Sequence, residues 1–114
     1  MSVHLFAGMR VRELAAAQAW YEQLLGEPSF FPNDIEAVWT LADDRFVYVM
    51  EDADGAGHGL VTLFVDDLET WIDAIAARGL QPAERETYEN GVRKLTFRDP
   101  DGNEIGFGGP PAAA

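Results

Sequence analysis

Hydrophobic positions along this chain follow two periods, and the order of the periods occurs twice. Apolar residues three and four apart run from Val11 to Gly26, and again from Val65 to Gly79. This spacing places them on one face of a helix, and glycine commonly ends a helix. A strand-like run precedes each helix, at residues 3–11 and 60–65. The two helical patterns start 54 positions apart (65 minus 11), which indicates two copies of one module.

Alternating runs that are typical of strands follow each helix. In the first half they cover 29–31, 37–42 and 45–50, with Asp43-Asp44 as the turn of a hairpin. In the second half they cover 82–88, 92–98 and 103–108, with turns at Asn90-Gly91 and at 99–102. The pattern predicts the order βαβββ twice. The expected fold is therefore α+β, with two sheets, helices outside and a cleft inside.

The length of 114 residues predicts a single domain over residues 1–109, with modules of about 3–52 and 58–108. We expect the Pro- and Ala-rich residues 110–114 to form a flexible tail. Asp66 and Glu69 have the spacing of a capping box, so they are the expected start of the second helix.

The acidic composition limits the partners of the chain. It contains 8 basic and 20 acidic residues and has a net charge of −12. This balance argues against nucleic-acid binding. It indicates a solvated surface that keeps the protein soluble, with attraction of a cationic ligand as the alternative. There is no cysteine for disulfides or thiolate sites, and no apolar stretch as long as a membrane span. The first residues have no basic start and no long apolar run, so we expect a cytoplasmic protein without a signal peptide.

Three segments carry a resemblance to a known family. They read "VRELAAAQAWYEQLLG", "VTLFVDDLETWIDAIAARG" and "GVRKLTFRDPDGNEIGF". They resemble the vicinal oxygen chelate superfamily, which includes glyoxalase I, extradiol dioxygenases, fosfomycin-resistance enzymes and bleomycin-resistance proteins. The resemblance covers residues 3–108 and implies the glyoxalase/bleomycin-resistance fold. It does not fix the function, because members of this superfamily do unrelated chemistry on one scaffold.

The resemblance also implies where a metal would bind. Metal-dependent members use histidines on the first strand of each module and glutamates on the last. The matching positions here are Phe6, Tyr48, Leu60 and Gly106, none of which is a normal metal ligand. We therefore expect neither a metal nor another cofactor.

A shifted metal site is the alternative. His4, His58 and Glu104 lie two positions before Phe6, Leu60 and Gly106, so strand alternation points them to the same face. However, two residues along a strand span about 6–7 Å, whereas zinc–ligand bonds are about 2 Å long. The shift is therefore large compared with a metal–ligand bond, and the metal-free cleft is the preferred interpretation.

Strand alternation predicts which side chains face the cleft. The expected cleft residues are Phe6, Gly8, Tyr48, Leu60, Thr62, Lys94, Thr96 and Gly106. The opposite set should face the helices, and it consists of Leu5, Ala7, Met9, Val11, Val47, Val49, Val61, Leu63, Val65, Leu95 and Phe97. Gly8 and Gly106 should leave space in the cleft. In the alternative interpretation, the apolar members only fill a dimer or inter-module core.

The function best supported by these patterns is metal-independent binding of a small molecule, aromatic or cationic, in an apolar cleft. Open sheet faces and edges also predict a homodimer. Two alternatives stay open. One is a metal-dependent lyase or dioxygenase that uses the shifted site, and the other is a non-catalytic stress or interaction module. No catalytic residue can be assigned.

Overall fold

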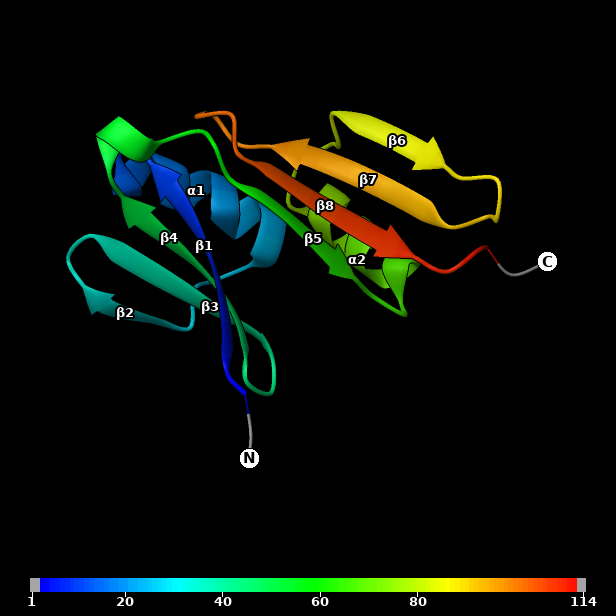
Figure 1. The fold of residues 1–114 in the computed structure, drawn as a ribbon, viewed down its shortest axis with the longest axis horizontal. Helices are drawn as coiled ribbons and strands as arrows, with labels where there is room; N and C mark the ends of the chain where they lie inside the picture. The colour runs from blue at the N-terminus through cyan, green and yellow to red at the C-terminus, as the bar shows by residue number, and fades with distance from the viewer. Residues whose placement is uncertain (1–2, 113–114) are drawn as a thin grey trace.

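Each half of the chain forms a four-stranded sheet with one helix packed on it (Figure 1). The computed structural model describes residues 3–112. The first module contains β1 (Leu5–Val11), α1 (Leu14–Leu25), β2 (Phe30–Asn33), β3 (Glu36–Ala42) and β4 (Arg45–Glu51). A 3-10 turn, η1 (Ala53–Gly55), leads to β5 (Leu60–Phe64), α2 (Leu68–Ala77), β6 (Glu84–Thr87), β7 (Arg93–Arg98) and β8 (Glu104–Gly109). The predicted α+β fold of two βαβββ modules is confirmed.

The two sheets have the same topology, with strand orders β1-β4-β3-β2 and β5-β8-β7-β6. In each sheet the first and last strands of the module are parallel, and the other pairs are antiparallel. Matching positions have matching neighbours: Gly8 lies opposite Tyr48, and Thr62 lies opposite Gly106. The equivalence of the two modules therefore extends to individual strand positions.

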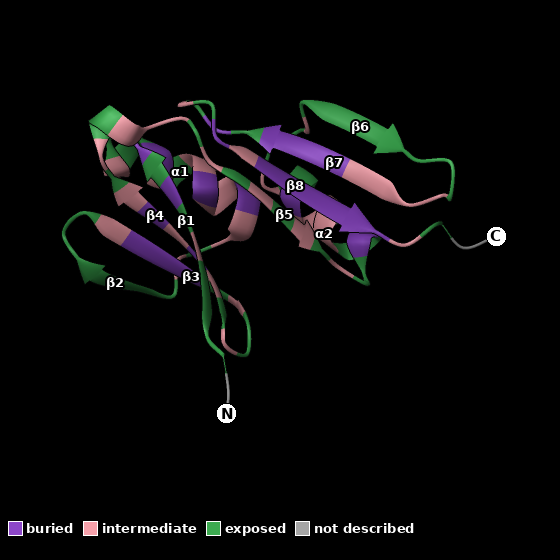
Figure 2. Cartoon of the chain, in the orientation of Figure 1, coloured by how far each residue is buried: buried purple, intermediate pink, exposed green. Residues whose placement is uncertain are grey.

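The core lies between the sheets and the helices, which cover the same side of both sheets (Figure 1). Its side chains come from both modules, among them Tyr21, Trp39 and Phe107. Burial is greatest on the inner strands β3, β7 and β8, whereas the edge strands β2 and β6 are exposed (Figure 2). We call the side of each sheet that carries no helix its open face.

The predicted strand faces are largely confirmed. Six of the residues expected under the helices are at most 6% exposed, namely Met9, Val11, Val47, Val49, Leu95 and Phe97. Val61, Leu63 and Val65 are partly buried against the same core. Leu5 lies on the same face, beside Ala7 and Val47, but it is 61% exposed. The start of β1 extends past the end of α1, so no helix covers it there (Figure 1).

A buried polar network joins the two modules. Asp99 accepts hydrogen bonds from the Tyr21 hydroxyl (2.7 Å) and from Asn103 Nδ2 (2.8 Å). Asn103 also donates to the Arg10 carbonyl (2.8 Å) and accepts from the Gly59 backbone N–H (2.7 Å). The turn at 99–103 thus connects α1, β1 and the start of β5, because one buried amide can donate and accept at the same time.

The two helices begin differently, and only the start of α1 is capped by a residue distant in sequence. The backbone N–H of Leu14 donates to Glu51 Oε1 at the end of β4 (3.0 Å). The predicted capping box of α2 is wrong: the N-cap is Asp67, without a side-chain cap, and Glu69 instead forms an ion pair with Arg93. Neither helix in residues 3–112 is long and apolar enough to cross a membrane.

The predicted tail lies only partly within the described residues. The carbonyl of Pro110 accepts a hydrogen bond from Arg93 Nε (3.4 Å), and Pro111 lies against Gly91 in the β6–β7 turn. Residues 113–114 fall outside the described range.

Candidate functional site

The open face of the first sheet presents a group of aromatic rings. Phe6 and Phe46 stack with their ring centroids 4.3 Å apart and an interplanar angle of 11°. Tyr48 meets Phe6 edge-on, with a centroid distance of 6.4 Å. Phe6 is 49% exposed in the chain, although large aromatic side chains usually bury most of their surface. An uncovered aromatic group of this kind is typical of a binding surface.

A cavity of about 320 Å³ lies beside this group. It is lined by Gly8, Met9, Arg10, Tyr48, Met50, Gly55, His58 and Gly59. Its volume is at the lower end of the range for small-molecule sites, about 300–1,000 Å³. The wall includes one aromatic ring, two thioethers, one imidazole and the Arg10 guanidinium, which is paired with Asp52 (3.3 Å). Because the larger part of its exposed wall is polar, the cavity offers directed polar contacts beside the apolar surface of the Tyr48 ring.

The ring of Tyr48 lies directly on the backbone of β1 at Gly8. A Cβ at this position would be 2.5 Å from the Cζ of Tyr48, which is closer than real Cβ contacts come. Glycine is needed here because the ring fills the volume that a side chain would take. Gly8 therefore does not leave the empty space that the sequence suggested.

The open face of the second sheet combines hydroxyl groups with one lysine. Thr62, Gly106 and Thr96 form a row across β5, β8 and β7. A Cβ at Gly106 would be 2.8 Å from Lys94 Cε and 3.3 Å from Thr62 Oγ1. The Lys94 side chain thus fills the expected gap above Gly106. Thr96 is only 5% exposed, whereas Leu60 is 70% exposed at the rim of the same face.

The eight predicted cleft residues form two groups on two sheets. Phe6, Gly8 and Tyr48 lie together on the first sheet, and the other five lie on the second. The cavity at Gly8 and Tyr48 includes none of the second group.

The segment before β5 was missed by the sequence analysis as part of this cavity. It folds back over β1, and the Gly57 N–H donates to the Arg10 carbonyl (3.4 Å). This fold brings Gly55, His58 and Gly59 into the cavity wall. The alternation of glycines at 55, 57 and 59 was the available signal.

The residues at the positions implied for a metal do not fit one. Phe6, Leu60 and Gly106 have no donor atom in their side chains, and Tyr48 offers only a phenol. The shifted set is not assembled either. His4 pairs with Asp44 (3.1 Å), Glu104 pairs with Arg98 (3.0 Å), and His58 lies at the first-sheet cavity. Between residues 3 and 112, the structure contains no group of three or more His, Asp or Glu side chains that could hold a metal ion.

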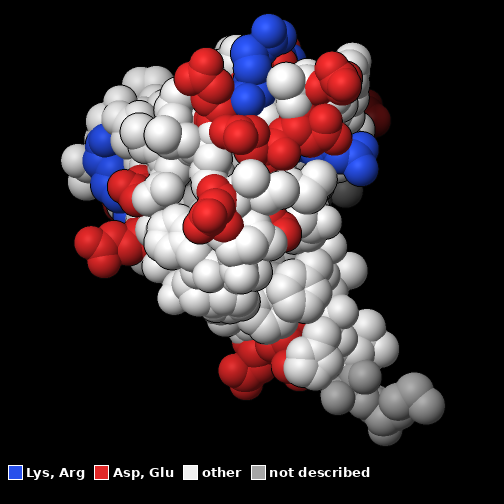
Figure 3. Space-filling view, turned by 90° about the vertical axis from the view of Figure 1, so that its left-hand side faces the viewer, with Lys and Arg blue, Asp and Glu red and all other residues white. Residues whose placement is uncertain are grey.

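The charged groups around the site are mostly paired. Acidic side chains outnumber basic ones on the side of the molecule shown in Figure 3, and uncharged side chains cover its middle. Arg98, on the open face of the second sheet, donates to Glu84 (2.8 Å) and Glu104 (3.0 Å). Hydrogen bonds to Glu84 and then to Glu104 raise the pKa of Arg98 above its usual value. Two carboxylates of the chain thus pair with this guanidinium.

Comparisons with known proteins agree with this architecture. A structure described as a glyoxalase/bleomycin resistance protein from Catenulispora acidiphila has 50% sequence identity and a TM-score of 0.92, and the match covers 96% of this chain and 100% of that one. A bleomycin-binding protein in complex with bleomycin shares the fold at 18% identity and a TM-score of 0.74, over 95% and 98% of the two chains.

A lactoylglutathione lyase from Agrobacterium tumefaciens shares the fold at 19% identity and a TM-score of 0.73, over 96% and 94% of the chains. No curated protein sequence matches the chain. The family model of the Glyoxalase/Bleomycin resistance protein/Dioxygenase superfamily matches residues 3–107. The repeated βαβββ module, the two open sheet faces and this match lead to one conclusion: the chain belongs to the Glyoxalase/Bleomycin resistance protein/Dioxygenase superfamily.

Proposed function

We propose that this protein binds a small molecule without a metal, in an aromatic and apolar cleft made by the open sheet faces. The observation that carries the proposal is the cavity of about 320 Å³ beside the exposed Phe6–Phe46 stack. The cavity supplies mainly polar contacts, and the stacked rings beside it supply apolar surface. Small-molecule sites usually combine the two. The bleomycin-binding protein with the same fold supports the choice of a small molecule over a macromolecule.

The cleft is completed in a homodimer. In the single chain Phe6 is 49%, Leu60 70% and Phe64 62% exposed, all on open faces. Two-fold dimers are the commonest way to cover such surfaces. If the first sheet of one chain faces the second sheet of its partner, both groups of predicted cleft residues line one site. The aromatic rings then supply apolar contact, and Lys94 with the threonines supplies the polar contacts.

Metal independence rests on the donor set, in which Phe6, Leu60 and Gly106 have no donor atom. Elemental analysis of protein purified without a chelator or a metal-affinity tag tests it. We expect far less than one transition-metal ion per chain. Near-unit occupancy that disappears in a His4→Ala, His58→Ala variant would contradict the proposal and establish the shifted site.

A thermal-shift screen of aromatic compounds, both cations and amphiphilic antibiotics, tests the cleft itself. Met50→Trp fills the first-sheet cavity, and Gly106→Leu adds bulk to the second open face, where it displaces the flexible end of Lys94 and crowds the Thr62 hydroxyl. The control is Ala76→Trp, which adds the same indole at an exposed position on α2.

Compounds that stabilise the wild type should stabilise Ala76→Trp equally and lose most of their effect on the two cleft variants. Equal stabilisation of all four proteins would place the binding site elsewhere. The absence of any hit would favour the interaction module.

A further inference from the structure

Lys94 is the only lysine among the eight basic residues of the chain, and its side chain lies over the inner strand β8 on the second open face. Its Cε is 2.8 Å, and its Nζ 3.7 Å, from the point where a Gly106 Cβ would be. The side chain therefore crosses from β7 over the backbone of β8. Thr62 Oγ1, from β5, is 3.3 Å from the same point. An ammonium and a hydroxyl thus meet above a position that has no side chain.

This ammonium has no acceptor within the chain as described. Each of the seven arginines has at least one, in hydrogen bonds or ion pairs that involve Arg10, Arg12, Arg45, Arg78, Arg85, Arg93 and Arg98. For residues 3–112, neither a hydrogen bond nor an ion pair of the Lys94 side chain is found. Such isolation is notable in a chain with 20 acidic residues.

The carboxylates near Lys94 are turned elsewhere. Glu84 and Glu104 are both held by Arg98. Glu86 is the direct neighbour of Lys94 across β6 and β7, but β6 lies on the other side of β7 from β8. Because Lys94 reaches toward β8, it extends away from Glu86. The position of the ammonium is thus set by packing on Gly106 rather than by an ion pair within the chain.

We propose that Lys94 and Thr62 form a subsite for the carboxylate of an aromatic or apolar ligand. The inference rests on the proposed function and deepens it by assigning the charge of the ligand. An ammonium and a hydroxyl donate charge-assisted hydrogen bonds to a carboxylate. A monoanion matches the single positive charge, whereas a dianion would be repelled more strongly by the net charge of −12.

This assignment differs from the cationic ligand that the overall charge favours. Interactions between exposed charges are screened beyond about 8 Å at physiological ionic strength. The long-range field of the chain therefore affects mainly the rate of encounter, and the group in direct contact decides the orientation of the bound ligand. At the open face of the second sheet, that group is an ammonium.

Three probes with one aromatic body test the charge preference: 2-naphthoate, 2-naphthylmethanol and 2-naphthylmethylammonium. Protein labelled with ¹³C at the lysine ε-carbon gives a single signal, because Lys94 is the only lysine. We expect naphthoate to shift this signal and to bind about tenfold more tightly than the alcohol, as a charge-assisted hydrogen bond predicts. The ammonium probe should bind most weakly.

Lys94→Gln should remove the about tenfold preference for naphthoate over the alcohol. Thr62→Val, which removes one hydroxyl, should reduce the preference by a smaller factor. The matched control is Arg85→Gln, which makes the same charge change on the same sheet. Arg85 lies opposite Leu95, whose buried side chain faces the core. The Arg85 side chain therefore projects to the helix side of the sheet, away from the open face.

The outcomes separate this inference from the proposed function. If the alcohol binds to the wild type and naphthoate binds no more tightly, the carboxylate subsite is wrong and the cleft stands. If Lys94→Gln and Arg85→Gln weaken naphthoate equally, the effect is general electrostatics and the subsite is again wrong. If acetate shifts the lysine signal as strongly as naphthoate does, the subsite stands and the aromatic cleft is wrong. Failure of all three probes to bind overturns both.

Discussion

A single hydroxyl group shows how closely the two modules depend on each other. Tyr21 lies on α1 with its side chain fully buried, and its hydroxyl donates to Asp99 in the second module (2.7 Å). Burial, then the hydrogen bond to Asp99 and the charge of Asp99, raise the pKa of Tyr21 above its ordinary value. The folded protein therefore holds this proton more tightly than the unfolded chain does.

Replacing Tyr21 with phenylalanine should change both stability and its pH dependence. Because the pKa is raised on folding, the stabilisation is fully present below the unfolded value of about 10 and is lost as the pH rises above it. At pH 7, Tyr21→Phe should lower the free energy of unfolding by about 1.5–3 kcal/mol, the range for a hydrogen bond to a charged group. Above pH 10 its stability should fall less steeply than that of the wild type.

Urea unfolding between pH 7 and pH 11 measures both effects. Tyr88→Phe is the control, since Tyr88 is 46% exposed. If the two variants have the same slope above pH 10, the Tyr21–Asp99 hydrogen bond does not account for the pH dependence.

At the scale of residues, alternation was enough to predict which side chains face the core. It could not predict what lies above the glycines. The free volume at Gly8 depends on the rotamer of Tyr48 in the neighbouring strand, and that at Gly106 on the path of Lys94. Both are decided by packing between strands that are distant in sequence, so the sequence pattern at the glycine alone contains no information about them.

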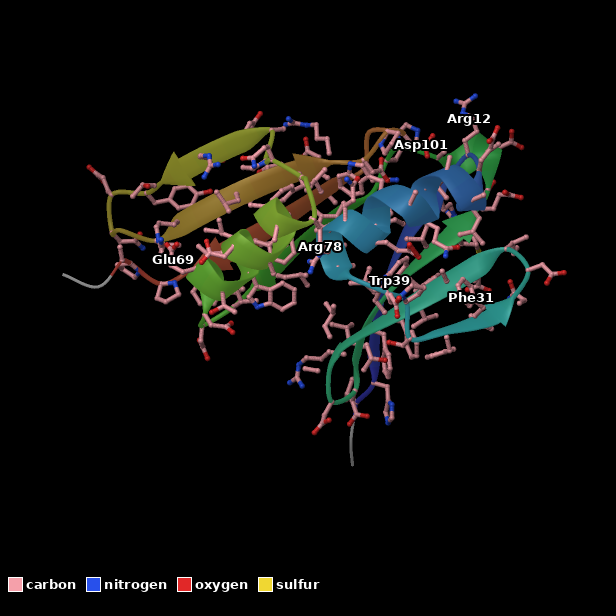
Figure 4. The ribbon with its side chains drawn as sticks, turned by 180° about the vertical axis from the view of Figure 1, so that it is seen from behind. Arg12, Phe31, Trp39, Glu69, Arg78 and Asp101 are labelled. Carbon is pink, nitrogen blue, oxygen red and sulfur yellow. The ribbon has the colours of Figure 1, made fainter. Side chains whose placement is uncertain are left out.

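At the scale of elements, one arginine holds the ends of the two helices together. Arg78 follows α2 and donates from Nε to the Gln23 carbonyl (2.7 Å) and from Nη2 to the Leu24 carbonyl (2.9 Å). Gln23 Nε2 in turn donates to the Arg78 carbonyl (3.2 Å). Seen from behind in Figure 4, Arg78 lies between the two helices. A cation at the last carbonyls of α1 also complements the dipole of that helix.

Arg78→Met keeps much of the side-chain length and removes the donors. It should lower the free energy of unfolding by about 1.5–3 kcal/mol, because two carbonyl groups lose a charged partner. Arg85→Met is the matched control, since the Arg85 side chain makes only a long contact with Gln81 (3.5 Å). Urea unfolding curves with the same cost for both variants would show that Arg78 does not hold the helices together.

Hydrophobic periodicity predicted both helices and most strands, because each element needs one apolar face. It did not predict how the helices begin. The Leu14 N–H finds its acceptor in Glu51, 37 residues later, and Glu69 turns from the backbone of α2 to Arg93. Capping rules describe partners that are close in sequence. Here a tertiary contact supplies the acceptor for α1, and another takes Glu69 away from the backbone of α2.

At the scale of the whole molecule, the open faces predict self-association. We expect sedimentation and light scattering to give twice the chain mass at micromolar concentration, because burying Leu60 and Phe64 removes apolar surface from water. Leu60→Glu, Phe64→Glu should give a folded monomer, since charges on this face oppose its burial.

Ala76→Glu, Ala77→Glu is the control for dimerisation, because it adds the same charges at exposed positions on α2. It should remain a dimer. A wild type with the mass of one chain at micromolar concentration would contradict the prediction.

The repeat made the fold predictable, because each copy of the pattern supports the interpretation of the other. The relation between the two groups of cleft residues was not predictable in the same way. The alternation of apolar and polar residues predicts which side of a sheet is apolar, but it does not predict which surface packs against that side. The sequence therefore identified both halves of the candidate site without fixing how they come together.

The polar network also limits how much of the fold can form before synthesis of the chain is finished. Arg10 and Tyr21 are synthesised early, but their partners Asn103 and Asp99 follow 93 and 78 residues later. Until then the Tyr21 hydroxyl must remain hydrated, because burying it without a partner is costly. The first module cannot reach its final packing while the ribosome is still making the second. Although the chain is built from two copies of one module, its last turn completes the fold of its first strand and helix, and the repeat folds as one unit.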